Sequence, residues 1–142
     1  MAAPKKLSKV QHENLAAFRY ALRKFLHFSE ETARRAGITA QQHQALLAIK
    51  GFPGPHPVTI RDLAERLQLR HHSVVGLLDR LADLKLTTRK RAPADHRQVQ
   101  VQLTAHGEQI LEKLSATHEA QLRRIGPELS ALLEKLRVER HA

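Results

Sequence analysis

The stretch VTIRDLAERLQLRHHSVVGLLDRLADLKLTTRKRAPADHRQVQVQLTAHG, residues 58–107, decides the fold. It predicts a short helix after Thr59, because the threonine hydroxyl can cap free backbone amides while Asp62 complements the helix N-terminus. Residues at helical spacing give this helix one apolar stripe, formed by Ile60, Leu63, Ala64 and Leu67. A turn over 68–70 leads to a second helix, whose apolar set is Val74, Leu77, Leu78, Leu81 and Leu84.

The second helix also has a polar face. Small and polar groups lie toward its N-terminal end, and a helix of that kind can enter a major groove. The face consists of His72, Ser73, Gly76, Asp79, Arg80 and Asp83, with Val75 on its flank. An ordinary solvated helix face would have a similar composition, so the residues that follow have to distinguish the two interpretations.

Residues 86–103 predict a β-hairpin next to this helix. The first arm, LTTRKR, is β-branched and basic, APADHR forms a polar turn, and the second arm, QVQVQL, alternates strictly. Val99, Val101 and Leu103 therefore face one side. A basic edge suited to phosphates or a narrow minor groove is formed by Arg89, Lys90, Arg91 and Arg97. Two helices followed by such a hairpin predict a winged helix-turn-helix.

Asp95 is an acid inside this basic edge. A carboxylate near phosphates is unfavourable unless it is paired, so Asp95 is expected to hold the side chain of Arg97 in one orientation. The alternative is a turn-favouring aspartate after Pro93, selected for backbone reasons.

These motifs resemble the MarR family of bacterial transcription regulators. LAERL, LLDRL, a basic strand, DHR and LTAHG occur in order, and a D-x-R wing followed by L-T-x-x-G is fairly specific to that family. The N-terminal helix, the ITAQQHQALLAI helix and the long C-terminal helices are similar to the helices with which the family dimerises. The resemblance implies a mainly α fold with a small β-wing (α+β) in a single domain over 1–142. Dimerisation helices would occupy 1–51 and 105–142, and the DNA-binding region 58–104.

The resemblance also implies which residues contact DNA and what the contact achieves. The exposed face of residues 71–80 would enter the major groove, and Arg97, supported by Asp95, would enter the minor groove. The expected DNA-binding set is Arg70, His71, His72, Ser73, Val75, Gly76, Arg80, Arg89, Arg91, Asp95 and Arg97. The implied protein is a homodimeric repressor of a pseudo-palindromic promoter site on double-stranded DNA, although activation is the outcome where the site lies elsewhere in a promoter.

Two positions depart from the family pattern. Lys85 stands where the family usually has a glycine after the second helix, so this helix is expected to stop without a favoured left-handed residue. Gly76 lies inside the helix, where glycine costs roughly 1 kcal/mol relative to alanine. Its bare backbone either allows a close approach to base edges or reflects neutral drift.

Composition limits the function further. A chain of 142 residues with a net charge of +10 suits one domain with a polyanionic partner. It has no cysteine, which excludes thiol-based sensing. We found no ligand-spaced metal cluster, phosphate loop or nucleophile elbow, so the sequence predicts no metal, no cofactor and no enzymatic activity. Without a long apolar run or signal peptide, the protein is expected to be soluble and cytoplasmic, with no membrane partner.

The flanking segments carry apolar stripes that need a partner helix. Leu15, Phe18, Leu22 and Phe25 form one stripe, and Leu129, Leu132, Leu133 and Leu136 form another beyond an expected break at Gly126-Pro127. A chain this short has little core to cover two long helices, which favours a homodimer.

The middle helix is expected to begin after Thr39, with Gln42 in the reciprocal capping position, and to end near Gly51 before a stiff proline-rich loop. The family binds small, often aromatic or acidic, molecules between its dimerising helices and its DNA-reading region. Polar residues that could contact such a ligand here are Arg19, Tyr20, Arg23, His27 and His43. Each could equally be a solvated side chain. The alternative function is a winged helix that binds duplex DNA non-specifically or an acidic protein partner.

Overall fold

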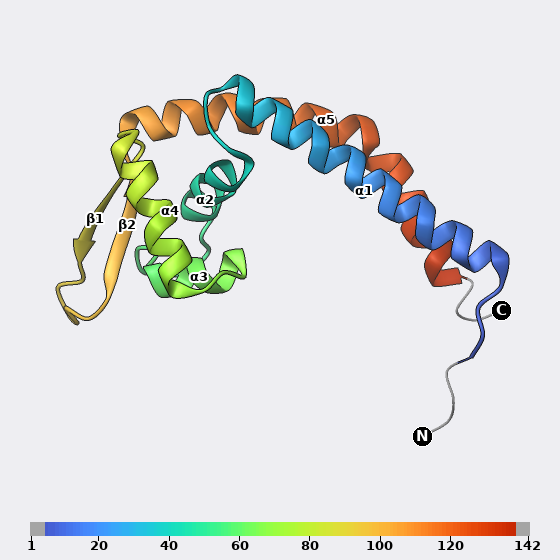
Figure 1. Ribbon diagram of the computed structural model, residues 1–142, viewed down its shortest axis with the longest axis horizontal. Helices are drawn as coiled ribbons and strands as arrows, with labels where there is room; N and C mark the ends of the chain where they lie inside the picture. The colour runs from blue at the N-terminus through green and yellow to red at the C-terminus, as the bar shows by residue number, and fades with distance from the viewer. Residues whose placement is uncertain (1–4, 139–142) are drawn as a thin grey trace. The chain divides into compact units, whose positions relative to one another are not determined.

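The computed structural model describes residues 5–138 and is mainly helical with a two-stranded wing, as predicted. The elements run in the order α1 (Lys9–Arg35), α2 (Ala40–Lys50), α3 (Ile60–Leu67), α4 (His71–Asp83), β1 (Thr87–Arg91), β2 (Val99–Leu103) and α5 (Ala105–Val138) (Figure 1). The terminal residues of the expected dimerisation segments, 1–4 and 139–142, lie outside the described residues. No helix in the described part is long and apolar enough to cross a membrane.

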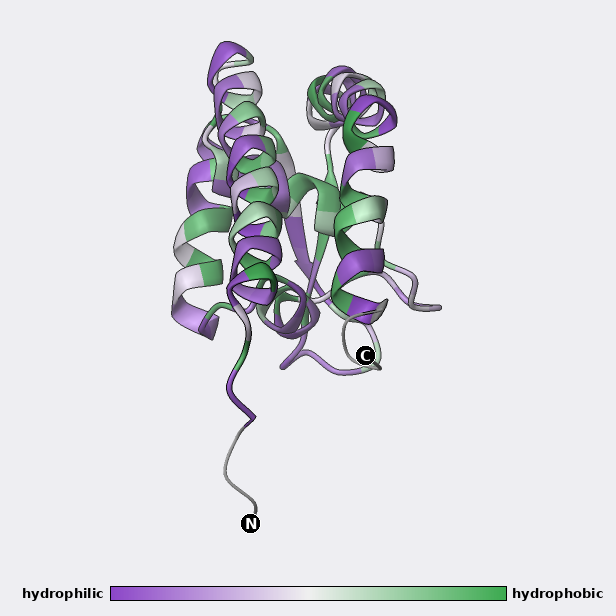
Figure 2. Cartoon of the chain, turned by 90° about the vertical axis from the view of Figure 1, so that its right-hand side faces the viewer, coloured by the Kyte–Doolittle hydropathy of each residue, from purple (hydrophilic) through white to green (hydrophobic). Residues whose placement is uncertain are grey.

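Contacts divide the chain into two compact units, which we describe separately. We call Glu31–Ala116 the head; it contains α2, α3, α4, both strands and the neighbouring ends of α1 and α5. We call the other unit, Met1–Glu30 with Thr117–Ala142, the helix pair. Figure 2 shows hydrophilic residues (purple) and hydrophobic residues (green) interspersed along the helices.

The head encloses one apolar core. Every element of the head except β1 contributes buried side chains to it, and β1 is preceded by the buried Leu86. The largest fully buried members are Leu46, Leu63, Leu77, Leu78, Leu81, Leu86, Val74 and Val101. The apolar spacing read from the sequence is therefore confirmed, with one exception. Leu84 follows the last residue of α4 and is exposed, because the helix has ended before it would turn inward.

Both predicted capping boxes are present. The Thr59 hydroxyl accepts from the Asp62 amide at 3.1 Å, and the Asp62 carboxylate accepts from the Thr59 amide at 2.9 Å. Thr39 and Gln42 make the equivalent pair at the start of α2, with 3.0 Å in both directions. These reciprocal bonds satisfy amides that have no partner within a helix, so they fix where α2 and α3 begin.

The end of α4 differs from expectation. Lys85 itself adopts the left-handed conformation, with φ +61°, so the helix does end on a left-handed residue. The Leu86 amide donates to the Leu81 carbonyl and the Lys85 amide to the Ala82 carbonyl, both at 2.9 Å. This is a Schellman ending, which normally takes glycine. Its two hydrogen bonds and the burial of Leu86 offset the steric cost of a side chain at Lys85.

The helix pair consists of α1 up to Glu30 and α5 from Thr117 onward. The predicted break at Gly126-Pro127 is wrong, since α5 runs unbroken through Pro127. Proline removes one helical hydrogen bond, and at this site the helix continues without it. The buried His118 bonds through Nε2 to the Ser29 hydroxyl at 2.8 Å and lies edge-on to Phe25 and Phe28.

Candidate nucleic-acid interface

The wing is an antiparallel hairpin anchored to the rest of the head. β1 pairs with β2 from Thr87 opposite Leu103 to Arg91 opposite Val99. A bridge between Thr59 and Gln100 adds a third backbone segment, and the Val101 amide donates to the Val58 carbonyl at 2.9 Å. These bonds hold the base of the wing against the start of α3.

The L-T-x-x-G motif has a structural role at this junction. The Thr104 hydroxyl donates to the Lys85 carbonyl at 2.7 Å and accepts from the Gly107 amide at 3.0 Å. The Thr104 amide donates to the Leu86 carbonyl at 3.0 Å. A Cβ on Gly107 would overlap that same carbonyl oxygen, so only glycine fits. The motif thus joins the end of α4 to the start of α5 through hydrogen bonds from the Thr104 hydroxyl and the Thr104 amide.

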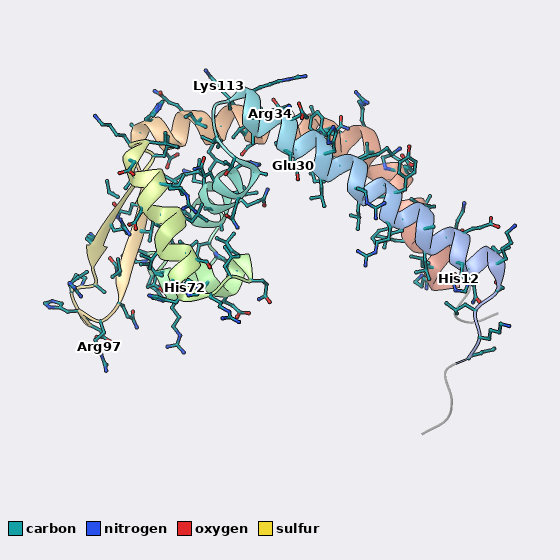
Figure 3. The ribbon with its side chains drawn as sticks, in the orientation of Figure 1. His12, Glu30, Arg34, His72, Arg97 and Lys113 are labelled. Carbon is teal, nitrogen blue, oxygen red and sulfur yellow. The ribbon has the colours of Figure 1, made fainter. Side chains whose placement is uncertain are left out.

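Arg97 projects from the tip of the wing. Its side chain is 91% exposed, and Figure 3 shows it pointing away from the ribbon. The Asp95 carboxylate accepts from the Arg97 Nε at 3.1 Å, from a terminal nitrogen at 3.3 Å and from the backbone amide at 3.1 Å. The side-chain and then the backbone bonds from Arg97 lower the pKa of Asp95 below its ordinary value. The geometry therefore agrees with the orienting role expected for Asp95.

The polar face of α4 is available to a ligand. His72, near the N-terminal end of the helix in Figure 3, is exposed, as are Arg70, His71 and Arg80. Ser73, Val75 and Gly76 are half-buried. A Cβ on Gly76 would meet nothing closer than the end of the Arg80 side chain at 3.9 Å, so internal packing does not require glycine there.

Two wing arginines make contacts within the head. A terminal nitrogen of Arg89 donates to the Asp79 carboxylate at 2.7 Å, which joins β1 to the polar face of α4. A terminal nitrogen of Arg91 donates to the His96 carbonyl at 2.7 Å and braces the loop at the wing tip. Both arginines were expected to contact DNA, and their partners could not be predicted because Asp79 lies on another element and His96 in the turn between the strands.

A cleft of about 470 Å³ brings three of the expected residues together, Asp95 among them. His71, at the start of α4, and Arg97, at the wing tip, both line it, with Ile60 and Val99 among the apolar lining residues. Arg61 lines the same cleft and was missed from the sequence. Its position in the first turn of a capped helix is the only sequence signal that could have indicated it. The described residues contain no cluster of three or more metal-ligating side chains.

The expected ligand-binding residues fall in both units. Arg19, Tyr20, Arg23 and His27 are all exposed on α1, within the helix pair. His43 belongs to the head, where the residue is buried. Their role in ligand binding stays a prediction.

Comparison with known proteins gives one family. Residues 36–98 match the sequence model of the MarR family. Three solved structures share the fold. AbsC, a MarR family transcriptional regulator from Streptomyces coelicolor, has a TM-score of 0.78 and 20% identity over 95% of this chain and 93% of AbsC. CouR from Rhodococcus jostii, bound to p-coumaroyl-CoA, has a TM-score of 0.73 and 18% identity over 93% of this chain and 92% of CouR.

The third is a variant of MepR from Staphylococcus aureus bound to an oligodeoxyribonucleotide. Its TM-score is 0.66, with 21% identity over 86% of this chain and 94% of MepR. No curated protein matches the chain in sequence. At these identities the structural likeness establishes the fold.

Proposed function

We propose that this chain, whose residues 36–98 match the model of the MarR family, is a transcription regulator that acts as a homodimeric repressor of a pseudo-palindromic promoter site and is released by a small molecule. Repression follows when the bound dimer blocks access of polymerase to the promoter. This function requires contact with the chromosome and therefore the cytoplasm.

The observation that carries the proposal is the arrangement of Arg97 beside the polar face of α4. The guanidinium is oriented by Asp95 yet almost wholly exposed, and α4 begins with exposed polar side chains. A helix of this kind reads base edges in the major groove, while an arginine at its side suits the negative potential of a narrow minor groove. Orienting the arginine before binding reduces the entropy lost on contact.

Exposed leucines of the helix pair support dimerisation. Each helix presents three leucines at spacing i, i+7 and i+11, which lie on one side of a helix with 3.6 residues per turn. The outer members are exposed: Leu15 by 42%, Leu26 by 57%, Leu122 by 44% and Leu133 by 52%. The middle members, Leu22 and Leu129, are half-buried. A second copy that covers these leucines would supply the second head, at a spacing of about one DNA turn, roughly 34 Å.

The proposed function also includes a small-molecule effector that releases the protein from DNA. CouR shows that a protein of this fold binds an aromatic acyl-CoA. In the present chain, Arg19, Tyr20, Arg23 and His27 offer cationic and aromatic groups on α1, and an arginine pairs well with a carboxylate. His43 is the remaining candidate.

The test is binding of the purified protein to the DNA upstream of its own gene and, in parallel, to a scrambled duplex of equal length. At physiological salt a specific regulator should prefer its site by about 1,000-fold or more. Equal affinity for both duplexes, together with no enriched inverted repeat among genomic fragments selected by binding, would refute specific repression. That result would favour the non-specific winged-helix module.

A further inference from the structure

One cleft of the head lies between the two parts that the proposed function places in the grooves of DNA. It is the cleft of about 470 Å³ that is lined by His71, the first residue of α4, and by Arg97 at the wing tip. In the proposed complex α4 enters the major groove and Arg97 enters the minor groove. A sugar–phosphate backbone separates the two grooves of a duplex, so one backbone strand has to cross the cleft between these residues.

The start of α3 forms one side of this cleft. Ile60 and Arg61, the first two residues of α3, line it together with Val99 of β2. The capping box at Thr59 fixes where α3 begins, and the bridge between Thr59 and Gln100 holds this end of the helix against the wing. Arg61 therefore has a defined backbone position beside the path of the DNA backbone.

The charge of Arg61 is not used within the head. Its side chain is exposed and has no hydrogen bond or ion pair with any residue in 5–138, including Glu65 one turn along α3. The carboxylate that lines the cleft, Asp95, accepts three hydrogen bonds from Arg97, which offset its repulsion of an anion. The guanidinium of Arg61 is thus free to bind an anion that enters the cleft.

We propose that this cleft holds one phosphate group of the DNA backbone and that Arg61 binds it. The inference rests on the proposed function, because the placement of α4 and Arg97 in the two grooves defines the path of the backbone. A guanidinium makes charge-assisted hydrogen bonds to phosphate oxygens, and phosphate contacts position a protein on DNA without reading its sequence. Arg61 adds a contact from α3 to the expected DNA-binding set, which came from residues 70–80 and the wing.

The test is the salt dependence of DNA binding by the full-length protein. Fluorescence anisotropy measures the affinity for the DNA upstream of its own gene and for a scrambled duplex of equal length. Arg61→Gln should weaken binding to both duplexes by about tenfold or more, because a hydrogen bond to a charged group is lost. The slope of log K against log salt should decrease by about one for each head that contacts the duplex.

Arg66→Gln is the matched control, because Arg66 is an exposed arginine on the same helix that does not line the cleft. Its Cζ lies 5.9 Å from the centroid of the Phe52 ring. This variant removes the same charge from the head and should leave the salt slope unchanged. Arg61→Lys keeps the charge and should retain the wild-type slope. Both Arg61 variants should melt with the wild type, since the side chain has no partner to lose.

Three results would overturn the contact at Arg61. They are a salt slope that Arg61→Gln leaves unchanged, an equal decrease in Arg66→Gln, and weaker binding to the upstream duplex alone, which indicates base readout. Failure of the proposed function looks different, because the wild type then binds both duplexes equally. A slope lowered on both duplexes by Arg61→Gln but not by Arg66→Gln would still support a phosphate at Arg61.

Discussion

The head and the helix pair bury their apolar side chains differently. In the head, leucine, isoleucine and valine from five elements close one core, and only Leu47 and Leu84 are large exposed hydrophobics among the described residues. In the described part of the helix pair, Leu132 is the one large apolar side chain that is buried, with 9% of its surface exposed, and Leu15, Leu26, Leu122 and Leu133 are exposed. Apolar surface gains about 25 cal/mol per Å² when it leaves water. The head thus buries most of its large apolar side chains within itself, whereas in the dimer that we propose a second copy would cover the exposed leucines of the helix pair.

The strongest test of this difference places charges on the leucines of the helix pair. The double variant Leu26→Glu/Leu133→Glu should be monomeric, because buried unpaired carboxylates oppose association. Its operator affinity should fall by about 100-fold or more, since the second head is no longer tethered. Light scattering after gel filtration measures the mass.

The matched control is Leu47→Glu/Leu84→Glu, which charges leucines of similar exposure in the head, 43% and 44%. This variant should stay dimeric. If Leu26→Glu/Leu133→Glu stays dimeric, or if Leu47→Glu/Leu84→Glu becomes monomeric, the helix pair is not the surface through which the chain dimerises.

Within the head, two glycines should respond in opposite directions to alanine. Gly107→Ala should lower the free energy of unfolding by about 1–3 kcal/mol or more, because its Cβ overlaps the Leu86 carbonyl. Gly76→Ala has room for its Cβ and should raise stability by about 0.5–1 kcal/mol. Urea denaturation measures both. Equal effects would mean that the L-T-x-x-G junction is not the tight contact described above.

Arg97→Ala should separate DNA contact from assembly. We expect operator affinity to fall by about 10- to 100-fold and the salt slope to decrease by about one, with the dimer intact. Arg137→Ala provides the control, since Arg137 is also an exposed arginine bonded to an acid, Glu134, but lies in the helix pair. If both variants bind the operator equally well, Arg97 does not contact DNA.

A smaller effect is expected at Thr87. Its hydroxyl is buried and has no hydrogen-bond partner among residues 5–138, so Thr87→Val should stabilise the head by about 1 kcal/mol. Thr88→Val, at the exposed neighbouring position, should change stability little. A loss of stability in Thr87→Val would show that the hydroxyl is bonded in solution.

The smallest expected effect is the change of the Asp95–Arg97 contact with pH near neutrality. The hydrogen bonds from Arg97 lower the pKa of Asp95 below its ordinary value, so the carboxylate stays charged and bound near neutral pH. The contact is lost only as the pH falls through the lowered pKa. The Arg97 amide shift should therefore titrate at a lower pH in the wild type than an unpaired aspartate does, and the Asp95 midpoint should rise in Arg97→Ala. An Asp95 midpoint that is the same in the wild type and in Arg97→Ala would contradict the pairing.

Local patterns predicted the elements of the head well. The capping boxes at Thr39 and Thr59, the apolar spacing of α3 and α4, and the alternation of β2 each depend on residues within one or two turns of each other. The pairing of Asp95 with Arg97 was also local and was predicted. Such features can be read from sequence because the interacting groups are close along the chain.

Two kinds of feature were not predicted: contacts between residues far apart in the sequence, and unfavourable local conformations that other interactions offset. Lys85 adopts a left-handed conformation, which the Schellman hydrogen bonds and a hydrogen bond from the Thr104 hydroxyl to the Lys85 carbonyl stabilise. The preference for glycine at such positions does not predict a lysine there. Pro127 was expected to end a helix, yet α5 continues through it. The contact of Arg89 with Asp79 joins two elements and required the fold.

The central claim is that two heads, joined by their helix pairs, read one specific site. The most direct measurement is the number of protomers bound per duplex, from the mass of the complex formed with the DNA upstream of the gene. We expect two protomers on that duplex and no defined complex on a scrambled one. One protomer per duplex, or an equal and indefinite number on both, would contradict it.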